Sequence, residues 1–331
     1  MRCYRLHFRA PLHIDDRGTG YYEASDPFVR SDTVSAALLT TWGQLDPENA
    51  TARAAKPPFR VSSAMPWLEG TPLLPRPVPH RAAPAPQGDP ALAKVTKGVQ
   101  WLSPRLWHRI WHEGWQQALH PDTVCTPQKE IALARDEASE PSPAWAQERR
   151  PRLNVDRITD GPVEGQLFEF GRIHFLPSAG LYLLAEHADE TARQGFEAAL
   201  SLLGDTGLGA DRNAGNGQFT WEPAADFQER LGVRQTEPGE SGVLVSLANP
   251  GLSERQWAGD ERSAYDITTR GGWIANYGIR RARVRMLTEG SFLSVTIQGR
   301  VLDVTPRALA SELPHPIYRD GRALMLRPEE G

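Results

Sequence analysis

The feature of this sequence best suited to contacting phosphate is a glycine-rich segment at residues 204–217, which reads GDTGLGADRNAGNG. Its glycines lie on both sides of Asp211, Arg212 and Asn213. Glycine allows backbone N–H groups to approach a phosphate closely. ATP and NAD are excluded as ligands, because the segment has no GK[ST] step and no G-x-G-x-x-G, and its expected order is helix to strand rather than strand to helix. It is therefore either a phosphate-contacting loop or an ordinary surface loop.

Two arginine-rich stretches have the chemistry to bind a nucleic-acid backbone. The first combines basic, polar and apolar residues, namely Arg149, Arg150, Arg152, Asn154, Val155, Asp156, Arg157 and Ile158. A basic hairpin with an apolar tip grips phosphates and wedges between bases, although a solvated hairpin has the same composition. In the second, Arg281, Arg283 and Arg285 fall on one face of an expected strand, where like charges repel until they meet an anion or acidic partner, or are simply solvated.

The sequence contains no constellation that predicts a metal, a cofactor or a catalytic centre. His108 and His112 are four residues apart, but Arg109 stands where a zinc-protease helix needs glutamate. Two cysteines, Cys3 and Cys125, form neither a disulfide framework nor a cysteine zinc site. There is no G-x-S-x-G motif and no paired carboxylate motif. We therefore expect a non-catalytic protein without cofactors.

Composition indicates a folded, turn-rich protein that must position these segments. The chain has 331 residues, 40% of them hydrophobic, with a net charge of −4, 29 glycines and 28 prolines. Glycine and proline exceed their usual shares of about 7% and 5%, which favours turns and long loops over a helical bundle. No apolar run is long enough to span a membrane, and the N-terminus does not resemble a signal peptide, so we expect a cytoplasmic protein.

In the first half of the chain, periodicity predicts a strand over residues 3–9 and a helix capped by Ser31-Asp32. Seven prolines within residues 72–90 predict a loop, and a second helix is expected from Ser103-Pro104. Residues 121–151 are irregular in pattern and predict an exposed insertion.

In the second half, residues 166–175 and 181–186 predict a hairpin, and Asp189 is expected to cap a helix before the glycine-rich segment. Strands are expected over 243–248, 272–275, 281–287 and 292–298, with a last hairpin at Asp320-Gly321. This order predicts an α+β fold of two ferredoxin-like units, with domains at 1–150 and 151–331.

The order of the motifs resembles a known family. In chain order they are YRLHFRAPLHI-x2-RGTG, RSDTVSAAL, PPFRVSSAMPW-x5-LLPRP, KVTKGVQWLSPRLW, NVDRITDGPVEGQLF, GLYLLAE, LGADRNAGNGQF, RGGWIA, RARVRMLTEGS and HPIYRDGRAL. This set resembles the fourth Csm subunit of type III-A CRISPR interference complexes, in the RAMP superfamily. The resemblance covers nearly the whole chain, except 72–90 and 121–150.

The resemblance implies two ferredoxin-like (RRM-like) folds, a projecting β-hairpin thumb and a glycine-rich loop. It implies a subunit that holds the 5′ repeat-derived tag of CRISPR RNA and meets the large cyclase–nuclease subunit and the adjacent backbone RAMP subunit. Target RNA would be met only indirectly, and no membrane is involved. The expected RNA-binding residues are His13, Arg17, Gly18, Ser31, Arg149, Arg152, Asn154, Val155, Asp156, Arg157, Gly207, Gly209, Asp211, Arg212, Asn213, Gly215, Gly217, Arg270, Gly271, Arg281 and Arg283.

Two alternatives remain open. Some RAMP relatives are metal-independent endoribonucleases that process precursor CRISPR RNA, for which His7, His13 or His174 would have to act as the base. The other is a protein scaffold without RNA contact. For the capping role we expect valine at Gly215 and Gly217 to weaken RNA retention while the fold stays intact.

Overall fold

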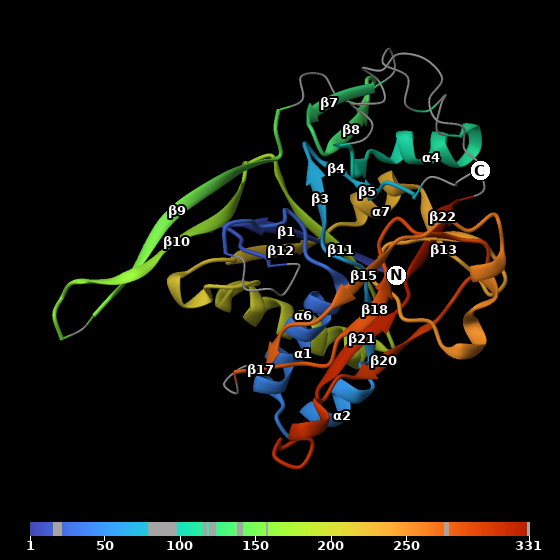
Figure 1. Ribbon diagram of the computed structural model, residues 1–331. Helices are drawn as coiled ribbons and strands as arrows, with labels where there is room; N and C mark the ends of the chain where they lie inside the picture. The colour runs from blue at the N-terminus through green and yellow to red at the C-terminus, as the bar shows by residue number, and fades with distance from the viewer. Residues whose placement is uncertain are drawn as a thin grey trace.

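The computed structural model describes residues 1–15, 22–78, 98–114, 118, 124–137, 142–156, 158–274 and 278–329, which form a mixed α+β fold as predicted (Figure 1). The helices are α1 Ser31–Leu45, α2 Ala50–Ala55, α4 Pro104–Glu113, α6 Glu190–Thr206 and α7 Ala225–Leu231. Short 3₁₀ turns are η1 Arg212–Ala214, η2 Leu252–Glu254, η3 Gln256–Gly259 and η4 Arg307–Leu309. Within these residues no helix is long and apolar enough to cross a membrane.

The largest sheet joins strands from distant parts of the chain. Its order is β12-β1-β11-β3-β4, with β2 also paired to β11, and every pairing is antiparallel. The strands are β1 Arg2–Phe8, β2 Phe59–Val61, β3 Met65–Leu68, β4 Thr71–Pro72, β11 Ala179–His187 and β12 Phe219–Pro223. The predicted first strand is therefore confirmed. Because β1 lies between two strands from beyond residue 150, the predicted boundary at 150/151 does not separate two sheets.

Helices cover both faces of this sheet. On one face Phe196 of α6 lies against Tyr4 and Phe59, with ring centroids 5.3 and 5.2 Å apart. On the other face Phe227 of α7 meets Tyr182 at 5.8 Å. As predicted, α6 follows a cap in which the Asp189 carboxylate accepts a hydrogen bond from the Ala192 N–H (2.7 Å).

The predicted cap of α1 is wrong, because both residues assigned to it lie inside the helix. Arg30 occupies the N-cap position and Ser31 is the first helical residue. The Ser31 hydroxyl accepts a hydrogen bond from the backbone N–H of Leu247 (2.9 Å), and Asp32 forms ion pairs with distant arginines. Both side chains therefore make tertiary contacts instead of capping their own helix.

Residues 121–151 are not an irregular exposed insertion. Strands β7 Val124–Gln128 and β8 Ile131–Ala134 join β5 Leu74–Pro75 and β6 Trp101–Leu102 in a second sheet, of order β5-β6-β8-β7. All four residues of β8 are buried, since it is a central strand. Prolines 72 and 75 each end a two-residue strand, so only part of the proline-rich stretch is a loop; residues 79–90 lie outside the described part. Helix α4 begins at Pro104 after Ser103, as predicted.

Strands β9 Trp145–Val155 and β10 Pro162–Phe175 form a long two-stranded ribbon that projects from the body (Figure 1). The predicted hairpin between residues 166–175 and 181–186 is therefore wrong. Both strands exist, but β10 pairs with β9, whereas β11 joins the large sheet. The Pro-Ser-Ala-Gly segment links two sheets rather than two paired strands.

The C-terminal region consists of short strands, as predicted, but several are shorter than expected. They are β13 Val233–Gln235, β14 Gly242–Leu244, β15 Ile267–Arg270, β16 Trp273–Ile274, β17 Ile279–Arg280, β18 Val284–Leu287, β19 Phe292–Leu293, β20 Gly299–Asp303, β21 Tyr318–Arg322 and β22 Met325–Pro328. Asp320-Gly321 is not a turn, because both residues pair with β20 inside β21. Arg281 and Arg283 precede β18, so the expected three-arginine strand face does not form.

We predict that Gly195→Ala destabilises the protein, although alanine is normally favoured over glycine within a helix by about 1 kcal/mol. A Cβ at Gly195 would overlap the indole ring of Trp42 on α1, so the two helices would have to separate. We expect a loss of about 1–3 kcal/mol in the free energy of unfolding, measured by guanidinium denaturation. Thr191→Ala, at an exposed site on the same helix, is the control and should cost little. A more stable Gly195→Ala variant would contradict this packing.

Candidate RNA-binding site

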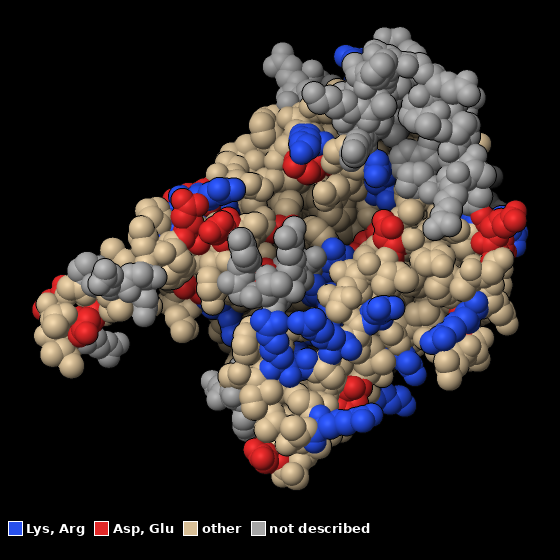
Figure 2. All heavy atoms as spheres, in the orientation of Figure 1, with Lys and Arg blue, Asp and Glu red and all other residues tan. Residues whose placement is uncertain are grey.

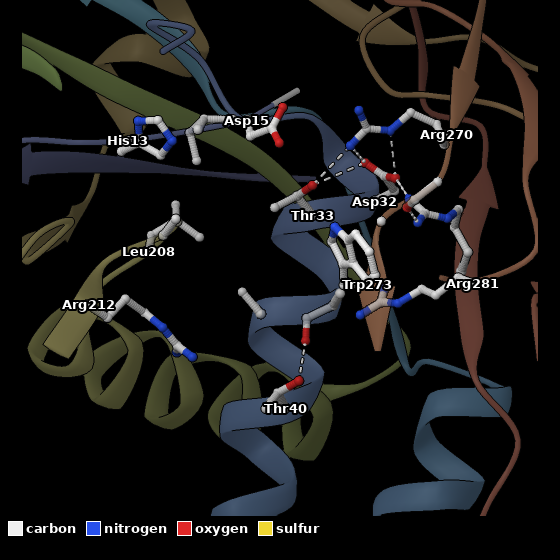
Figure 3. Close-up of a pocket in the computed structure, with 18 of the residues that line it drawn as sticks. His13, Asp15, Asp32, Thr33, Thr40, Leu208, Arg212, Arg270, Trp273 and Arg281 are labelled. Atoms are coloured by element: carbon white, nitrogen blue, oxygen red, sulfur yellow. Dashed lines mark hydrogen bonds and ion pairs between the residues drawn. The ribbon is translucent and has the colours of Figure 1, made fainter. Parts of the chain in front are cut away.

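A cavity of about 350 Å³ brings together segments that are far apart in the chain (Figure 3). It lies among the residues around His13, the exposed side of α1, the glycine-rich loop and the C-terminal strands. Seven of the residues predicted to bind RNA line it: His13, Gly207, Gly209, Arg212, Arg270, Gly271 and Arg281. The cavity also contains residues that the sequence analysis did not select, among them Asp32, Thr33, Trp273 and Arg319.

The glycines of the loop are needed mainly for packing within the protein. Gly207, Gly209 and Gly217 have φ values of 88°, 93° and 76°, a region that favours glycine. A Cβ would overlap the carbonyl oxygen of Asn216 at Gly207, that of His13 at Gly209 and that of Leu208 at Gly217. By contrast, a Cβ at Gly215 (φ 81°) would meet no atom within 4 Å. Valine at Gly217 would therefore disturb the loop itself, so the expectation of an intact fold is wrong at that position.

Asp211 connects the glycine-rich loop to the base of the β9–β10 ribbon. Its carboxylate lies 2.7 Å from the Arg152 guanidinium and 4.0 Å from that of Arg172, and it accepts a hydrogen bond from the Asn216 side chain (2.8 Å). The Arg152 guanidinium also lies over the ring of Phe170, 4.6 Å from its centroid. These contacts couple the ribbon to one wall of the cavity.

A buried carboxylate anchors the opposite wall. Asp32 accepts hydrogen bonds from Arg270 (2.9 and 3.0 Å) and pairs closely with Arg319, whose guanidinium also donates to the carbonyl of Gly271. Burial alone would raise the pKa of Asp32, but the two arginines outweigh it and hold the pKa below its ordinary value. The sequence pattern predicts Asp32 as a cap and does not single out Arg319, although both lie in motifs of the family resemblance, RSDTVSAAL and HPIYRDGRAL.

Arg281 is a half-buried cation that pairs with no carboxylate among the described residues. Burial, reinforced by the charge of Arg319, lowers its pKa below the ordinary value, and Asp32 partly opposes the shift. Its Nε is buried and has no hydrogen-bond partner among the described residues. With Arg212, Arg270 and Arg319 the cavity holds four arginines, against two carboxylates at Asp15 and Asp32. The cavity therefore carries excess positive charge and suits an anion.

The surface view agrees with this imbalance. Figure 2 shows basic side chains gathered in a patch over the region of α1 and the C-terminal strands. The chain as a whole has a net charge of −4, so the positive charge is a local property of this face.

The remaining predicted residues divide into three groups. Ser31 is buried in the contact with Leu247 and does not line the cavity. Asn213 and Arg283 are exposed nearby but are not part of the lining. Arg17, Gly18 and Arg157 lie outside the described residues.

The ribbon residues Arg149, Asn154, Val155 and Asp156 lie away from the cavity. The Asp156 carboxylate accepts hydrogen bonds from the backbone N–H groups of Ile158 and Thr159 (2.7 and 3.3 Å), which shapes the tip. Next to it the side chain of Ile158 is 95% exposed and that of Leu167 is 70% exposed. The tip therefore exposes apolar side chains, but it also carries the carboxylates of Asp156 and Asp160.

The histidines occupy dissimilar surroundings. His13 is fully buried, and its Nδ1 lies 2.7 Å from the carbonyl oxygen of Gly171. His7 and His174 are partly exposed and lie 3.2 and 2.8 Å from the carboxylates of Glu222 and Glu148. In the described parts of the chain, no group of three or more His, Cys, Asp or Glu side chains could hold a metal ion.

We predict that Gly217→Ala destabilises the protein more than Gly215→Ala. Alanine at positive φ costs roughly 1–2 kcal/mol at either position. Only Gly217→Ala adds an overlap with the backbone of Leu208, so its total loss should reach about 3 kcal/mol or more. Guanidinium denaturation of both variants measures the difference. Equal losses would show that the loop relaxes around the new methyl group.

Comparison with known proteins finds relatives of a single description. Residues 237–327 match a family model described as the CRISPR Csm4 C-terminal domain. A curated protein of Thermococcus onnurineus, "CRISPR system Cms protein Csm4", is 26% identical over 244 residues, which cover 71% of this chain and 70% of that protein. A protein of the same description from Methanocaldococcus jannaschii is 23% identical over 201 residues, 53% of this chain and 52% of the relative.

Solved structures share the fold along the whole chain. One comes from the crystal structure of the Csm3-Csm4 subcomplex in the type III-A CRISPR-Cas interference complex, with a TM-score of 0.67, 17% identity and full coverage of both chains. Another comes from the Csm1-Csm4 cassette in complex with pppApA, with a TM-score of 0.56, 18% identity and coverage of 99% and 98%. The family model, the curated relatives and the fold confirm the resemblance found in the sequence: residues 237–327 match the Csm4 C-terminal domain, and the chain as a whole is similar to Csm4 proteins in sequence and fold.

Proposed function

We propose that this chain is the subunit of a type III-A Csm complex that binds the 5′ repeat-derived tag of CRISPR RNA. The observation that carries the proposal is the cavity around Arg281, whose lining holds more arginines than carboxylates. Arg281 is half-buried, and its buried Nε has no hydrogen-bond partner among the described residues. A buried charge is costly unless it is paired, so such a site favours an anionic ligand. An RNA phosphate meets that need, and arginine binds phosphate through two parallel hydrogen bonds.

The surrounding elements give the RNA a defined path. The glycine-rich loop forms one wall of the cavity, and its Asp211 is paired to Arg152 at the base of the ribbon. An RNA strand bound in the cavity would therefore continue toward β9 and β10. Single-stranded RNA is usually bound through its backbone and through splayed bases, which a rigid loop and an apolar ribbon tip can both contact.

The fold also supports an assignment of the ferredoxin-like units and the thumb to particular segments of the chain. The large sheet follows the order β1–α1–β3–β11–α6–β12, a β-α-β-β-α-β unit that we assign as ferredoxin-like. We assign β9–β10 as the thumb of the RAMP superfamily and the C-terminal strands to a second unit of the same ancestry. The first unit then extends to residue 223, beyond the boundary expected from sequence.

The partners follow from the relatives. Solved structures pair Csm4 with Csm3 and with Csm1. We propose the same two neighbours here, a backbone subunit and the large cyclase–nuclease subunit, with target RNA met only through the guide. Because the chain is acidic overall, we expect tight RNA binding only when these partners close the channel.

We expect Arg281→Gln and Arg212→Gln each to weaken binding of tag RNA to the assembled complex and to reduce its salt dependence. Each lost phosphate contact should lower the slope of log K against log salt by about 0.7. Affinity measured across a salt series tests this. Arg262→Gln is the control, since Arg262 is exposed and pairs with Asp260 outside the cavity. Unchanged slopes for both cavity variants would overturn the phosphate site.

We also propose that the subunit is not an enzyme. His13 is fully buried, and His7 and His174 lie on separate strands beside Glu222 and Glu148, so the described contacts do not bring the three histidines together. Purified chain incubated with repeat RNA should leave the RNA intact, as judged by denaturing gels. Cleavage that disappears in His7→Ala or His174→Ala, but persists in the exposed control His112→Ala, would establish the endoribonuclease instead.

A further inference from the structure

A second cavity, of about 560 Å³, lies beside the arginine-lined one, between α1, α2 and the segment 313–318. The two cavities share Ala36, Thr40 and Arg281, so they are continuous along the exposed side of α1. The volume falls within the range of about 300–1,000 Å³ typical of small-ligand sites.

The lining of the second cavity is mostly apolar and includes one aromatic ring. Its apolar residues are Ala36, Leu39, Pro47, Ala50, Ala54, Ile274, Leu313, Pro314, Pro316 and Ile317. Tyr318 adds a half-buried ring that stacks on no other aromatic ring in the described parts of the chain. Gln44 and Thr40 place polar groups along α1, and the Thr40 hydroxyl donates to the Ala36 carbonyl (2.8 Å), which leaves its oxygen able to accept.

The alternation of strand β21 fixes the two cavities relative to each other. Tyr318 and Asp320 line the second cavity, whereas Arg319 between them turns to Asp32 in the first. Successive side chains of a strand point to opposite faces, so neighbouring residues serve adjoining sites. An anion held by the arginines would therefore lie one residue along the strand from the tyrosine ring.

We propose that the second cavity receives a single base of the RNA strand, splayed out from the nucleotide whose phosphate lies near Arg281. The inference rests on the proposed function. Arg281 lies at the junction of the two cavities. A ligand that fills both must therefore present an anionic group to the first cavity and a flat, largely apolar group to the second. A nucleotide has both groups. Tyr318 stacks on the base, and Gln44 and Thr40 face its polar edge. Splayed bases in RNA complexes are held by stacking and edge contacts of this kind.

The test uses the assembled complex and a series of synthetic tag RNAs, each carrying one abasic ribose at a different position. With the natural protein, an abasic ribose at one position of the tag should lower the affinity about tenfold more than an abasic ribose at the neighbouring positions, because one stacked base is lost. Tyr318→Ala should abolish that extra loss, whereas Tyr318→Phe should keep it. Ala54→Trp, on α2, should abolish it by filling the cavity from another element. Thermal unfolding of each variant confirms that it is folded.

The outcomes separate this inference from the function on which it rests. Arg281→Gln should flatten the salt slope, whereas Tyr318→Ala should leave the slope unchanged. If folded Tyr318→Ala and Ala54→Trp proteins keep the natural abasic profile, the cavity takes no base, even where Arg281→Gln still weakens binding. If they instead weaken binding of the purified large subunit, the cavity docks protein and the inference is wrong. Unchanged RNA binding in the Arg281 variant would reject the proposed function itself.

Discussion

The buried ion pairs of Asp32 hold the site together. The carboxylate lies on the first turn of α1, and its partners Arg270 and Arg319 are 238 and 287 residues away in the chain. A buried carboxylate is costly when it is unpaired, so the start of α1 is stable only when the C-terminal strands are in place. A second link has the same character: Arg30 pairs with the buried Glu289 at 2.6 Å. The N-terminal helix and the C-terminal strands therefore form one charged interface.

At the same interface, the arginines of the cavity outnumber the carboxylates. Asp32 pairs with Arg270 and Arg319, whereas Arg281 lies beside them and pairs with no carboxylate among the described residues. The charge of Arg319 lowers the pKa of Arg281 further. Arg270 and Arg319 are held in place by Asp32 before any ligand arrives, so these two side chains require little ordering on binding. The glycine-rich loop is rigid for a related reason, since Gly207, Gly209 and Gly217 each lie against a neighbouring carbonyl. A preformed cationic cavity with a closely packed wall suits a permanently bound RNA.

The ribbon joins this arrangement through a single residue of the loop. Asp211 adopts a positive φ of 59° and faces Arg152, Arg172 and Asn216. The loop therefore has two sides: Arg212 faces the cavity, and Asp211 holds the ribbon. This division explains how one short segment can connect the cationic cavity with a hairpin whose apolar tip lies far from it (Figure 1).

The sequence by itself determined the features that depend on neighbouring residues. The Asp189 cap of α6, the Ser103-Pro104 start of α4, the strand at the N-terminus and the position of the glycine-rich loop were all predicted, because caps, periodicity and turn residues act within a few positions. The motif order also predicted the family. Only the tertiary structure decided that β10 pairs with β9, that residues 131–134 form a buried strand, and that Asp32 and Arg319 meet. Those outcomes depend on which distant segment supplies the partner, and local pattern carries no information about that choice.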